Sequence, residues 1–413
     1  MRRRLGLVTA YLQTRSRRFS TREALLSWQA RRLRIALTRA VRTFPAYAGL
    51  PARLDAFPTV DKADWLDRFE DFNAAGLTLT ECLGAARAAE SGRDFTATLR
   101  GLSVGLSTGT SGRQGVFLTS PAERDRWAGT ILARALPRGL LAGAKVALFL
   151  RAGGPLYEAV GSGRVQFRFF DLALPLEGHD QALDDFAPTV LAAPPVVLER
   201  LAARLAAGRS TAAPERVYSI ADVLDADVRA RIEAGFQRPI GQIYQATEGF
   251  LGISCDRGTL HLNEDLLHFE LTDLGQSRVA PVVTDLYRTS QAIIRYRLGD
   301  VLVLGAPCPC GSVCTPIEAI EGRADDVLRF GDQAIFADFV RGAVLGAQGV
   351  ADFGLTQTED GLQLAVTPAL AWPGARDALA SLLAAHEVSA RIEPAPFVVQ
   401  SPAAKRRRVR RIN

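Results

Sequence analysis

The sequence has few of the features that mark membrane-spanning, disulfide-stabilised or hydrolytic proteins. It contains no run of about 18 apolar residues, so it predicts no membrane-spanning helix. Its five cysteines and four histidines in 413 residues suggest neither a disulfide framework nor a Ser-His-Asp arrangement. The basic N-terminus has only a short apolar stretch and no small-residue cleavage site, which is unlike a secretory signal. We therefore expect a cytoplasmic protein.

Positive charge is concentrated at the two ends of the chain. Residues 1–45 contain 12 arginines and one acidic residue, Glu23, and residues 405–411 add six more cations to a net charge of +6. The middle of the chain is therefore net acidic. A nucleic-acid-binding protein would be expected to carry a basic stripe with aromatic residues on its folded body. The observed distribution predicts no nucleic-acid partner.

From about residue 100 onward, short β-rich runs alternate with helical stretches. This alternation is typical of an α/β domain with a mostly parallel sheet. The clearest β-rich runs are residues 146–150, 165–172 and 190–193, and the clearest helical stretches are residues 123–136 and 196–207.

The pattern changes twice nearer the C-terminus. Residues 266–304 carry mainly β-type runs and predict a distinct β subdomain. After residues 322–331 the pattern changes again, and mixed strands with one helix, 375–386, predict a small α+β domain. We therefore expect a large N-terminal domain over residues 1–325 and a small C-terminal domain over residues 326–413.

Residues 20–42 predict a helix near the N-terminus. Ser20 and Glu23 have the spacing of a capping box, and apolar residues follow at helical intervals. The simplest interpretation is a surface helix packed on the large domain. A helix lying on a membrane surface is the alternative.

Leu106–Gly115 is rich in glycine and hydroxyl groups. Glycines let backbone N–H groups curve around an anion, and hydroxyls supply further donors. The segment lacks the Gly-Lys-Ser/Thr ending of a Walker loop. It predicts a polyphosphate-binding loop, although a flexible surface hairpin has a similar composition. The expected phosphate contacts are Ser107, Thr108, Gly109, Thr110, Ser111, Gly112 and Arg113.

Four further segments follow this loop in order. They read Tyr-Gln-Ala-Thr-Glu at 244–248, Arg-Tyr-Arg-Leu-Gly-Asp at 295–300, Glu-Gly-Arg-Ala-Asp-Asp at 321–326 and Ala-Ala-Lys-Arg-Arg-Arg-Val at 403–409. Alone, each could be an ordinary turn, a strand end or a solvated basic tail. Together they resemble the signatures of the adenylate-forming superfamily, which includes acyl-CoA synthetases, peptide-synthetase adenylation domains and luciferases. The compact length and the Cys-Pro-Cys-Gly segment resemble its phenylacetate–coenzyme A ligase branch, and within that branch the coenzyme-F synthetase-like proteins.

The resemblance implies ATP and Mg²⁺ as cofactors. The Tyr244 ring would cover the adenine and the Thr247 hydroxyl would bond the α-phosphate. Glu248 would hold Mg²⁺, which prefers carboxylate and phosphate oxygens together. Asp300 would accept hydrogen bonds from both ribose hydroxyls.

The resemblance also implies a mobile C-terminal domain. Arg323 would contact the nucleotide, and Asp325 would be the pivot about which the small domain rotates. Lys405 would bridge the carboxylate and the α-phosphate, where positive charge stabilises the developing transition state. A solvated basic tail is the alternative for Lys405.

Three positions depart from the family pattern. The loop has Arg113-Gln114-Gly115 where a Lys-Pro-Lys-Gly ending is common, so Arg113 would supply the missing charge. The segment 218–224 stands where the family has a Gly-rich, adenine-contacting turn, but it contains no glycine. The residue before Lys405 is alanine instead of the usual glycine.

A cysteine cluster predicts a metal site. Clustered cysteines in an apparently cytosolic chain indicate metal ligands, and structural zinc is commonly held by Cys₃His or Cys₄. The family resemblance suggests that the two cysteine-bearing segments meet in some members of this branch. We expect structural Zn²⁺ at Cys255, His261, Cys308 and Cys310. Reduced, unliganded cysteines near a turn are the alternative.

The resemblance implies a two-step reaction. A carboxylate attacks the α-phosphate of ATP to give acyl-AMP and pyrophosphate, and the thiol of coenzyme A or of an acyl carrier protein then takes the acyl group. Positioning and charge neutralisation suffice for the first step, so no nucleophilic side chain is required. Transfer to an amine or hydroxyl, and a nucleotide-binding scaffold without turnover, are the alternatives.

The sequence does not identify the small carboxylic acid. Residues 160–170 carry Arg164, Arg168 and three phenylalanines that could line a pocket for an aromatic or anionic acid, but core packing explains the phenylalanines equally well. The sequence leaves a homodimer open.

Overall fold

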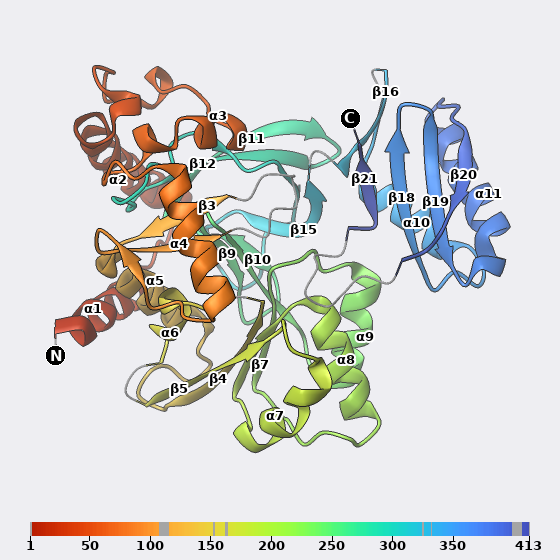
Figure 1. Ribbon diagram of the computed structural model, residues 1–413, viewed down its shortest axis with the longest axis horizontal. Helices are drawn as coiled ribbons and strands as arrows, with labels where there is room; N and C mark the ends of the chain where they lie inside the picture. The colour runs from red at the N-terminus through yellow and green to blue at the C-terminus, as the bar shows by residue number, and fades with distance from the viewer. Residues whose placement is uncertain are drawn as a thin grey trace. The chain divides into compact units, whose positions relative to one another are not determined.

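The computed structural model describes residues 2–106, 115–151, 153–161, 164–323, 326–331, 333–398 and 407–412. The chain forms two compact units, whose elements are labelled in Figure 1. Unit 1 comprises Met1–Thr272, Pro281–Leu298 and Leu304–Glu318, and unit 2 comprises Asp273–Ala280, Gly299–Val303 and Ala319–Asn413. Compactness does not test a functional division at residue 325, so that division stays a prediction.

Unit 1 begins with two long helices, α1 (Arg2–Ser16) and α2 (Arg22–Thr43). The sequence did not predict α1. The helix expected over 20–42 is confirmed, but the predicted capping box is wrong. Thr21 is the N-cap, and its hydroxyl accepts a hydrogen bond from the Ala24 amide at 3.2 Å.

The predicted parallel sheet is confirmed in unit 1. Strands β4, β5, β6, β7 and β8 pair in parallel in the order β5-β4-β6-β7-β8. They are β4 (Ala144–Leu150), β5 (Val165–Asp171), β6 (Val190–Ala193), β7 (Arg216–Ser219) and β8 (Gly241–Ala246). Each of the three predicted β-rich runs lies on one of these strands.

Helices cover both faces of this sheet (Figure 1). On one face, Leu132 of α5 packs with Leu148 of β4. On the other, Leu198 of α8 packs with Phe149 of β4, as expected from side chains that alternate along a strand. Besides α1 and α2, the α-helices described in unit 1 are α3 (Lys62–Asp67), α4 (Leu79–Gly92), α5 (Pro121–Ala135), α6 (Pro155–Glu158), α7 (Asp180–Phe186), α8 (Pro195–Ala206) and α9 (Ala226–Phe236).

Beyond β8 the sheet of unit 1 becomes antiparallel. β8 pairs with β9 (Gly249–Ser254), β9 with β10 (Leu260–Leu262) and β10 with β15 (Pro316–Arg323). A separate three-stranded sheet has the order β1-β2-β3. Its strands are β1 (Thr98–Leu99), β2 (Leu102–Leu106) and β3 (Val116–Thr119).

The β-type runs expected over residues 266–304 are confirmed as strands. They are β11 (Leu267–Gly275), β12 (Arg278–Asp285), β13 (Tyr296–Arg297) and β14 (Asp300–Leu304). β12 pairs antiparallel with β13 through Val283 and Tyr296 in unit 1. It pairs with β14 through Val279 and Leu302 in unit 2.

Unit 2 has the α+β composition that the sequence predicted. Its four-stranded sheet has the order β20-β19-β18-β21, and its core includes Leu355, Leu364, Val340 and Leu379. The elements are β16 (Leu328–Phe330), β17 (Gln333–Ile335), α10 (Ala337–Gly346), β18 (Asp352–Thr358), β19 (Gly361–Thr367), α11 (Trp372–Ala385), β20 (Ile392–Ala395) and β21 (Val409–Arg411).

None of the helices in the described part of the chain combines the length and hydropathy that crossing a membrane requires.

Candidate active site

Thr247 and Glu248 form the tip of a tight β-hairpin. Ala246 pairs with Gly249 across the β8–β9 connection, so these two residues are the whole turn. The parallel part of the sheet ends at β8, and ligand sites in α/β proteins commonly lie at the carboxyl ends of such strands. Both side chains are half-buried, which leaves them partly accessible to a ligand.

A small pocket in unit 1 collects Thr247 and Glu248 with residues from other segments. Gly115, the last residue of the predicted phosphate loop, and Lys62, the first residue of α3, line the same pocket. A cation, a carboxylate and a hydroxyl therefore line one pocket beside the end of the loop. The remaining lining residues are Trp65, Val116, Gln291, Ile293 and Tyr296.

Buried hydrogen bonds hold this pocket in shape. The Gln291 side chain is fully buried; its Oε1 accepts from the Leu118 amide at 3.0 Å and its Nε2 donates to the Val116 carbonyl at 3.3 Å. Arg288 donates through Nη1 to the Thr247 carbonyl at 2.7 Å and through Nη2 to the Leu118 carbonyl at 3.1 Å. Through these bonds, residues 288–291 hold both β3, which follows the predicted phosphate loop, and the Thr247-Glu248 turn.

Glu123 holds the same segment from α5. Its carboxylate accepts from the Thr289 amide at 2.6 Å and from the Ser290 amide and hydroxyl at 2.9 and 2.6 Å. Burial raises the pKa of Glu123, but the charge of Arg288 and these hydrogen bonds outweigh burial and lower it overall. The carboxylate therefore stays charged and keeps residues 288–290 in place.

The two predicted nucleotide-contacting residues in unit 2 lie close together. Arg323 Nη1 is 3.8 Å from Asp300 Oδ1. Gly299 has a φ of +72°, and a Cβ there would come within 2.8 Å of Arg323 Nη2. The left-handed φ favours glycine at this position, and the absence of a Cβ leaves room for the guanidinium. A role of this pair in binding the ribose and its phosphate stays a prediction.

Several predicted site residues lie outside the described residues. These are Ser107, Thr108, Gly109, Thr110, Ser111, Gly112, Arg113, Asp325 and Lys405. Tyr244 is described: it lies on β8 and is 7% exposed.

Residues 407–412, close to Lys405 in the sequence, are part of the fold of unit 2. Arg408 Nε is 2.8 Å from Asp352 Oδ1, and the Arg408 carbonyl accepts from the Leu355 amide at 2.6 Å. Val409 then pairs with Leu355 as β21 joins β18 in parallel. The segment from Arg407 to Ile412 is therefore not a solvated basic tail.

Core packing explains part of the aromatic run at 160–170. Phe170 is 2% exposed and stacks on Phe149 with ring centroids 4.5 Å apart. Arg168 donates to the Ala182 carbonyl at 3.1 Å. Phe167 is partly buried and packs against the other core cluster.

The four predicted metal ligands come together in unit 1. Their donor atoms all lie within 4.8 Å of one another. The Cys255 and Cys308 sulfurs are 3.8 Å apart, and Cys310 Sγ is 3.4 Å from His261 Nε2. Zn–S bonds of about 2.3 Å in a tetrahedron place two sulfurs about 3.8 Å apart, so the arrangement fits zinc.

A neighbouring backbone group orients the histidine. His261 Nδ1 lies 3.1 Å from the Cys314 carbonyl. A ring nitrogen that donates there leaves Nε2 with its lone pair toward the three sulfurs, as metal-ligating histidines usually require. Cys314 itself contributes no donor atom to the cluster.

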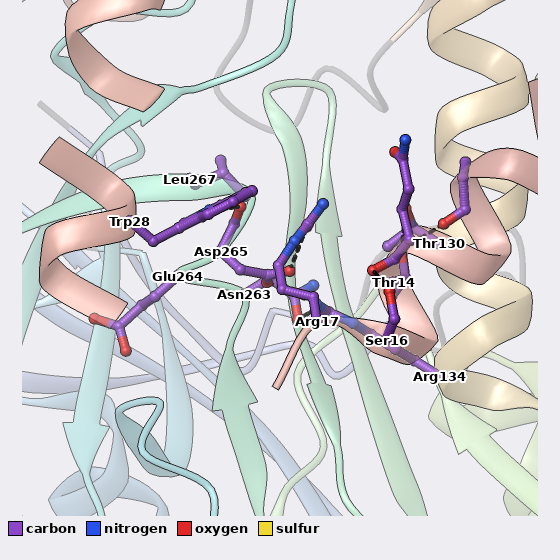
Figure 2. A network of polar contacts seen from close by, with 12 residues as sticks. Thr14, Ser16, Arg17, Trp28, Thr130, Arg134, Asn263, Glu264, Asp265 and Leu267 are labelled. Carbon is purple, nitrogen blue, oxygen red and sulfur yellow. Dashed lines mark hydrogen bonds and ion pairs between the residues drawn. The ribbon is translucent and has the colours of Figure 1, made fainter. Parts of the chain in front are cut away.

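A buried polar network joins residues 263–265, which follow His261, to the N-terminal helices. Asn263, Glu264 and Asp265 are each less than 5% exposed. Figure 2 shows Asp265 with Arg17 at the end of α1 and Arg134 of α5; the ion pairs measure 2.9 and 2.6 Å.

Glu264 links the same network to the cysteine-bearing loop. Arg22 donates to both oxygens of Glu264, at 2.5 and 2.6 Å, and Nη1 also reaches the Val313 carbonyl at 3.2 Å. The Thr315 amide donates to the same carboxylate at 2.6 Å. The loop between Cys310 and β15 is therefore tied to α2.

Sequence reasoning missed Lys62, Arg288 and Gln291. Lys62 is one of only three lysines in the chain, a scarcity that could have drawn attention to it. Arg288 and Gln291 have no comparable signal, because their roles depend on backbone groups far away in the sequence.

Comparison with known proteins identifies the fold. No protein-family model and no curated protein matches the chain. A solved structure of 2-hydroxyisobutyryl-CoA ligase in complex with 2-HIB-AMP is similar with a TM-score of 0.67 at 19% identity, over 95% of this chain and 89% of the ligase.

Two further structures cover less of the chain. The anthranilate CoA ligase AuaEII in complex with anthranoyl-AMP has a TM-score of 0.52 at 12% identity, over 74% of this chain and 65% of its own. The amide bond synthetase McbA from Marinactinospora thermotolerans has a TM-score of 0.52 at 15% identity, over 74% and 67%. The chain therefore shares the α/β fold of these ligases.

Proposed function

We propose that this protein activates a small carboxylic acid with ATP·Mg²⁺, forming an acyl-adenylate and pyrophosphate. The observation that carries the proposal is the pocket in which Thr247, Glu248 and Lys62 meet Gly115 at the end of the hydroxyl- and glycine-rich loop. That combination suits a metal-bound polyphosphate. The shared fold supports the proposal, since neighbouring structures contain acyl-AMP molecules.

Within this proposal each residue has a positioning or charge-neutralising role. Glu248 would hold Mg²⁺, which neutralises phosphate charge when bound. Thr247 would donate to the α-phosphate, and Lys62 would neutralise further phosphate charge. Asp300 and Arg323 would hold the ribose and its phosphate, and Tyr244 would lie against the adenine.

The loop and the C-terminal residues complete the proposed machinery. Ser107, Thr108, Gly109, Thr110, Ser111, Gly112 and Arg113 would cradle the phosphates, and Lys405 would neutralise the carboxylate and α-phosphate. The domain that follows Asp325 would rotate between the two half-reactions. The folding of residues 407–412 into unit 2 supports this part, because it would bring Lys405 along with that domain.

For the second step we propose acyl transfer to a thiol, from coenzyme A or an acyl carrier protein, in the cytoplasm where ATP is abundant. The sequence motifs favour the phenylacetate–coenzyme A ligase branch, and an aromatic acid is one candidate for the substrate. Transfer to an amine is the second candidate, because the similar structures include an amide bond synthetase.

Zinc completes the proposal as a structural ion. Three sulfurs and one imidazole nitrogen fill a tetrahedron, so no coordination position stays open for substrate. The ion would hold the β9–β10 connection to the loop before β15.

ATP–pyrophosphate exchange with a panel of aryl and aliphatic acids tests the first step. We expect at least one acid to support exchange in the wild-type protein and Glu248→Gln to abolish it. Binding of ATP without exchange for any acid would favour a non-catalytic nucleotide-binding scaffold. Chemically prepared acyl-AMP offered to coenzyme A, a carrier protein or an amine then identifies the acceptor.

A further inference from the structure

Arginines from α2 and α5 surround a single tyrosine in unit 1. The guanidinium carbons of Arg32 and Arg126 lie 4.2 and 4.4 Å from the centre of the Tyr287 ring. Arg39, also on α2, donates through Nη2 to the Arg288 carbonyl at 2.9 Å. We refer to Arg32, Arg39, Arg126 and Tyr287 as the arginine cluster.

The positive charge of the cluster is not balanced by carboxylates. In the part of the chain that the structure describes, Arg32, Arg39 and Arg126 form no ion pair. Arg17, whose guanidinium carbon lies 6.0 Å from the same ring, adds positive charge but is already paired with Asp265.

Two acids act electrostatically on the arginines of the cluster, but both accept hydrogen bonds from backbone amides. Asp285 Oδ1 accepts from the backbone amides of Tyr287 and Arg288 at 2.7 and 2.9 Å. Glu123 accepts from the amides of Thr289 and Ser290 at 2.6 and 2.9 Å. These acids reduce the positive potential around the cluster but offer its guanidinium groups no direct partner.

Polar atoms of the cluster are also buried without hydrogen bonds. Arg32 Nε, Arg39 Nε and the Tyr287 hydroxyl are such atoms among the described residues. Burial, followed by the positive charge of Arg32 and Arg17, opposes the charged form of Arg126 and lowers its pKa. Contact with an aromatic face compensates only part of the cost of burying a cation. Such a group of unsatisfied donors is what an oxyanion would satisfy.

We propose that the arginine cluster binds a phosphate-type oxyanion carrying two negative charges, such as inorganic phosphate. The planar guanidinium fork matches phosphate oxygens bidentately, and the Tyr287 hydroxyl supplies a further donor. A dianion balances three cations better than a carboxylate does.

This site is separate from the candidate active-site pocket. None of its four residues lines that pocket. Two hydrogen bonds nevertheless link the cluster to the pocket. Arg39 donates to the Arg288 carbonyl, and Arg288 donates to the Thr247 carbonyl.

Calorimetric titration with inorganic phosphate, at constant ionic strength kept with chloride, tests the proposal. We expect Arg32→Gln and Arg126→Gln each to weaken binding by about tenfold, since each removes a charge-assisted contact. Arg34→Gln is the matched control, because Arg34 lies on the same helix and is exposed. Equal phosphate binding by all four proteins would overturn the proposal.

Thermal unfolding separates anion binding from a purely structural role. In phosphate-free buffer, Arg32→Gln should be at least as stable as the wild type, because it relieves repulsion between cations. In phosphate, the wild type should become the more stable of the two. A variant that is destabilised equally in both buffers would show a structural role and contradict the proposal.

Two further arms identify the source of the phosphate signal. Binding that disappears in Thr247→Ala but persists in Arg32→Gln would assign phosphate to the ATP pocket and overturn the proposal. Sedimentation with phosphatidylglycerol vesicles, and with phosphatidylcholine vesicles as control, tests a lipid headgroup. Retention on the anionic vesicles that free phosphate fails to compete would overturn the assignment to a free oxyanion.

Discussion

Ala221 adopts a backbone conformation that favours glycine. It lies two residues after the end of β7, and its φ is +68°. The family that the sequence resembles commonly has a Gly-rich, adenine-contacting turn in this segment. The turn shape is thus formed here without the residue that would adopt it most easily, which stores strain at the carboxyl end of a parallel strand.

Replacing Ala221 by glycine should stabilise the protein. A residue other than glycine in the left-handed region costs about 1–2 kcal/mol of stability. Glycine avoids this cost but loses roughly 0.5–1 kcal/mol, because its unfolded state has more conformational entropy. We expect a net gain of about 0.5–1 kcal/mol in the free energy of unfolding, measured by urea denaturation. Ala203→Gly, on the exposed side of α8, is the control and should lose about 1 kcal/mol. A loss at both positions would show that Ala221 is not strained.

Lys62 should contribute to adenylation through its charge. Lys62→Gln removes the cation that lines the pocket with Glu248. We expect pyrophosphate exchange to fall by about tenfold or more. Lys145→Gln, at another of the three lysines, should change exchange by less than about twofold. Exchange that is insensitive to Lys62→Gln would remove this residue from the proposed site.

Asp265 should make stability depend on pH in the acid range. Burial raises its pKa, but Arg134 and then Arg17 outweigh burial and hold it below the ordinary value of 3.8. A carboxyl with a depressed pKa in the folded state contributes stability above its unfolded pKa. That contribution is lost as the pH falls through the folded value.

Asp265→Asn tests this linkage. At neutral pH we expect a loss of about 3 kcal/mol or more, because Arg17 and Arg134 lose their shared partner in a buried site. The difference from the wild type should shrink as the pH falls below about 4. Asp55→Asn, at an exposed ion pair with Arg53, should show no such effect. A wild-type–variant difference that is constant from neutral to acid pH would rule the linkage out.

At the scale of elements, the cluster of Cys255, His261, Cys308 and Cys310 brings a loop together with two strands. Cys255 follows β9, His261 lies on β10, and Cys308 and Cys310 belong to the loop that leads into β15. In the described part of the chain, this loop has no helix or strand of its own between Leu304 and Pro316. Its conformation therefore depends on the cluster and on the hydrogen bonds to Glu264.

Removing one metal ligand should release this loop. We expect Cys308→Ser to lose bound zinc, measured by elemental analysis, and to lower the free energy of unfolding by about 2 kcal/mol or more. Cys314→Ser is the control, because that residue gives only its carbonyl to His261. Zinc at one ion per chain in both variants would show that Cys308 is not a ligand.

Local sequence signals predicted most elements of the sheet and missed those that depend on distant partners. Val190–Ala193 is apolar throughout and is a fully buried strand, as its pattern indicated. α1 has no such pattern, since only Leu7, Ala10 and Tyr11 are buried among its residues with described side chains. Leu7 and Tyr11 belong to the same core cluster as residues of α5, so the place of α1 depends on packing against a distant helix. The N-cap of α2 is Thr21 instead of the predicted Ser20. Both residues carry a hydroxyl group, so the sequence alone does not distinguish between them.

The candidate site divides in the same way. Thr247 and Glu248 could be predicted because a short motif contains them, and the cysteines because ligands cluster in sequence. Gln291 and Arg288 could not, since their hydrogen bonds reach Leu118, about 170 positions away. The arginine cluster assembles from α2, α5 and the segment after β12, and no short motif records it.

At the scale of the whole molecule, the two half-reactions should depend differently on the C-terminal residues. Lys405→Ala should reduce pyrophosphate exchange by more than about 100-fold while a preformed acyl-adenylate is still used. Arg410→Gln removes a cation from β21, where it contacts Thr356, and should leave exchange nearly unchanged. Equal losses in both half-reactions would indicate damage to unit 2 instead of loss of one charge.

The two-residue turn at Thr247-Glu248 limits how this protein can evolve. Successive side chains on a strand point to opposite faces. Inserting or deleting one residue there would therefore move the side chains of β9 to the opposite face, unless a further bulge like the irregularity at Tyr244/Gln245 absorbed the change. His261, which pairs with Ile253 through the β9–β10 ladder, would then lose its orientation too. New specificities should therefore arise by substitution around this turn, whereas changes of length should be confined to surface loops elsewhere.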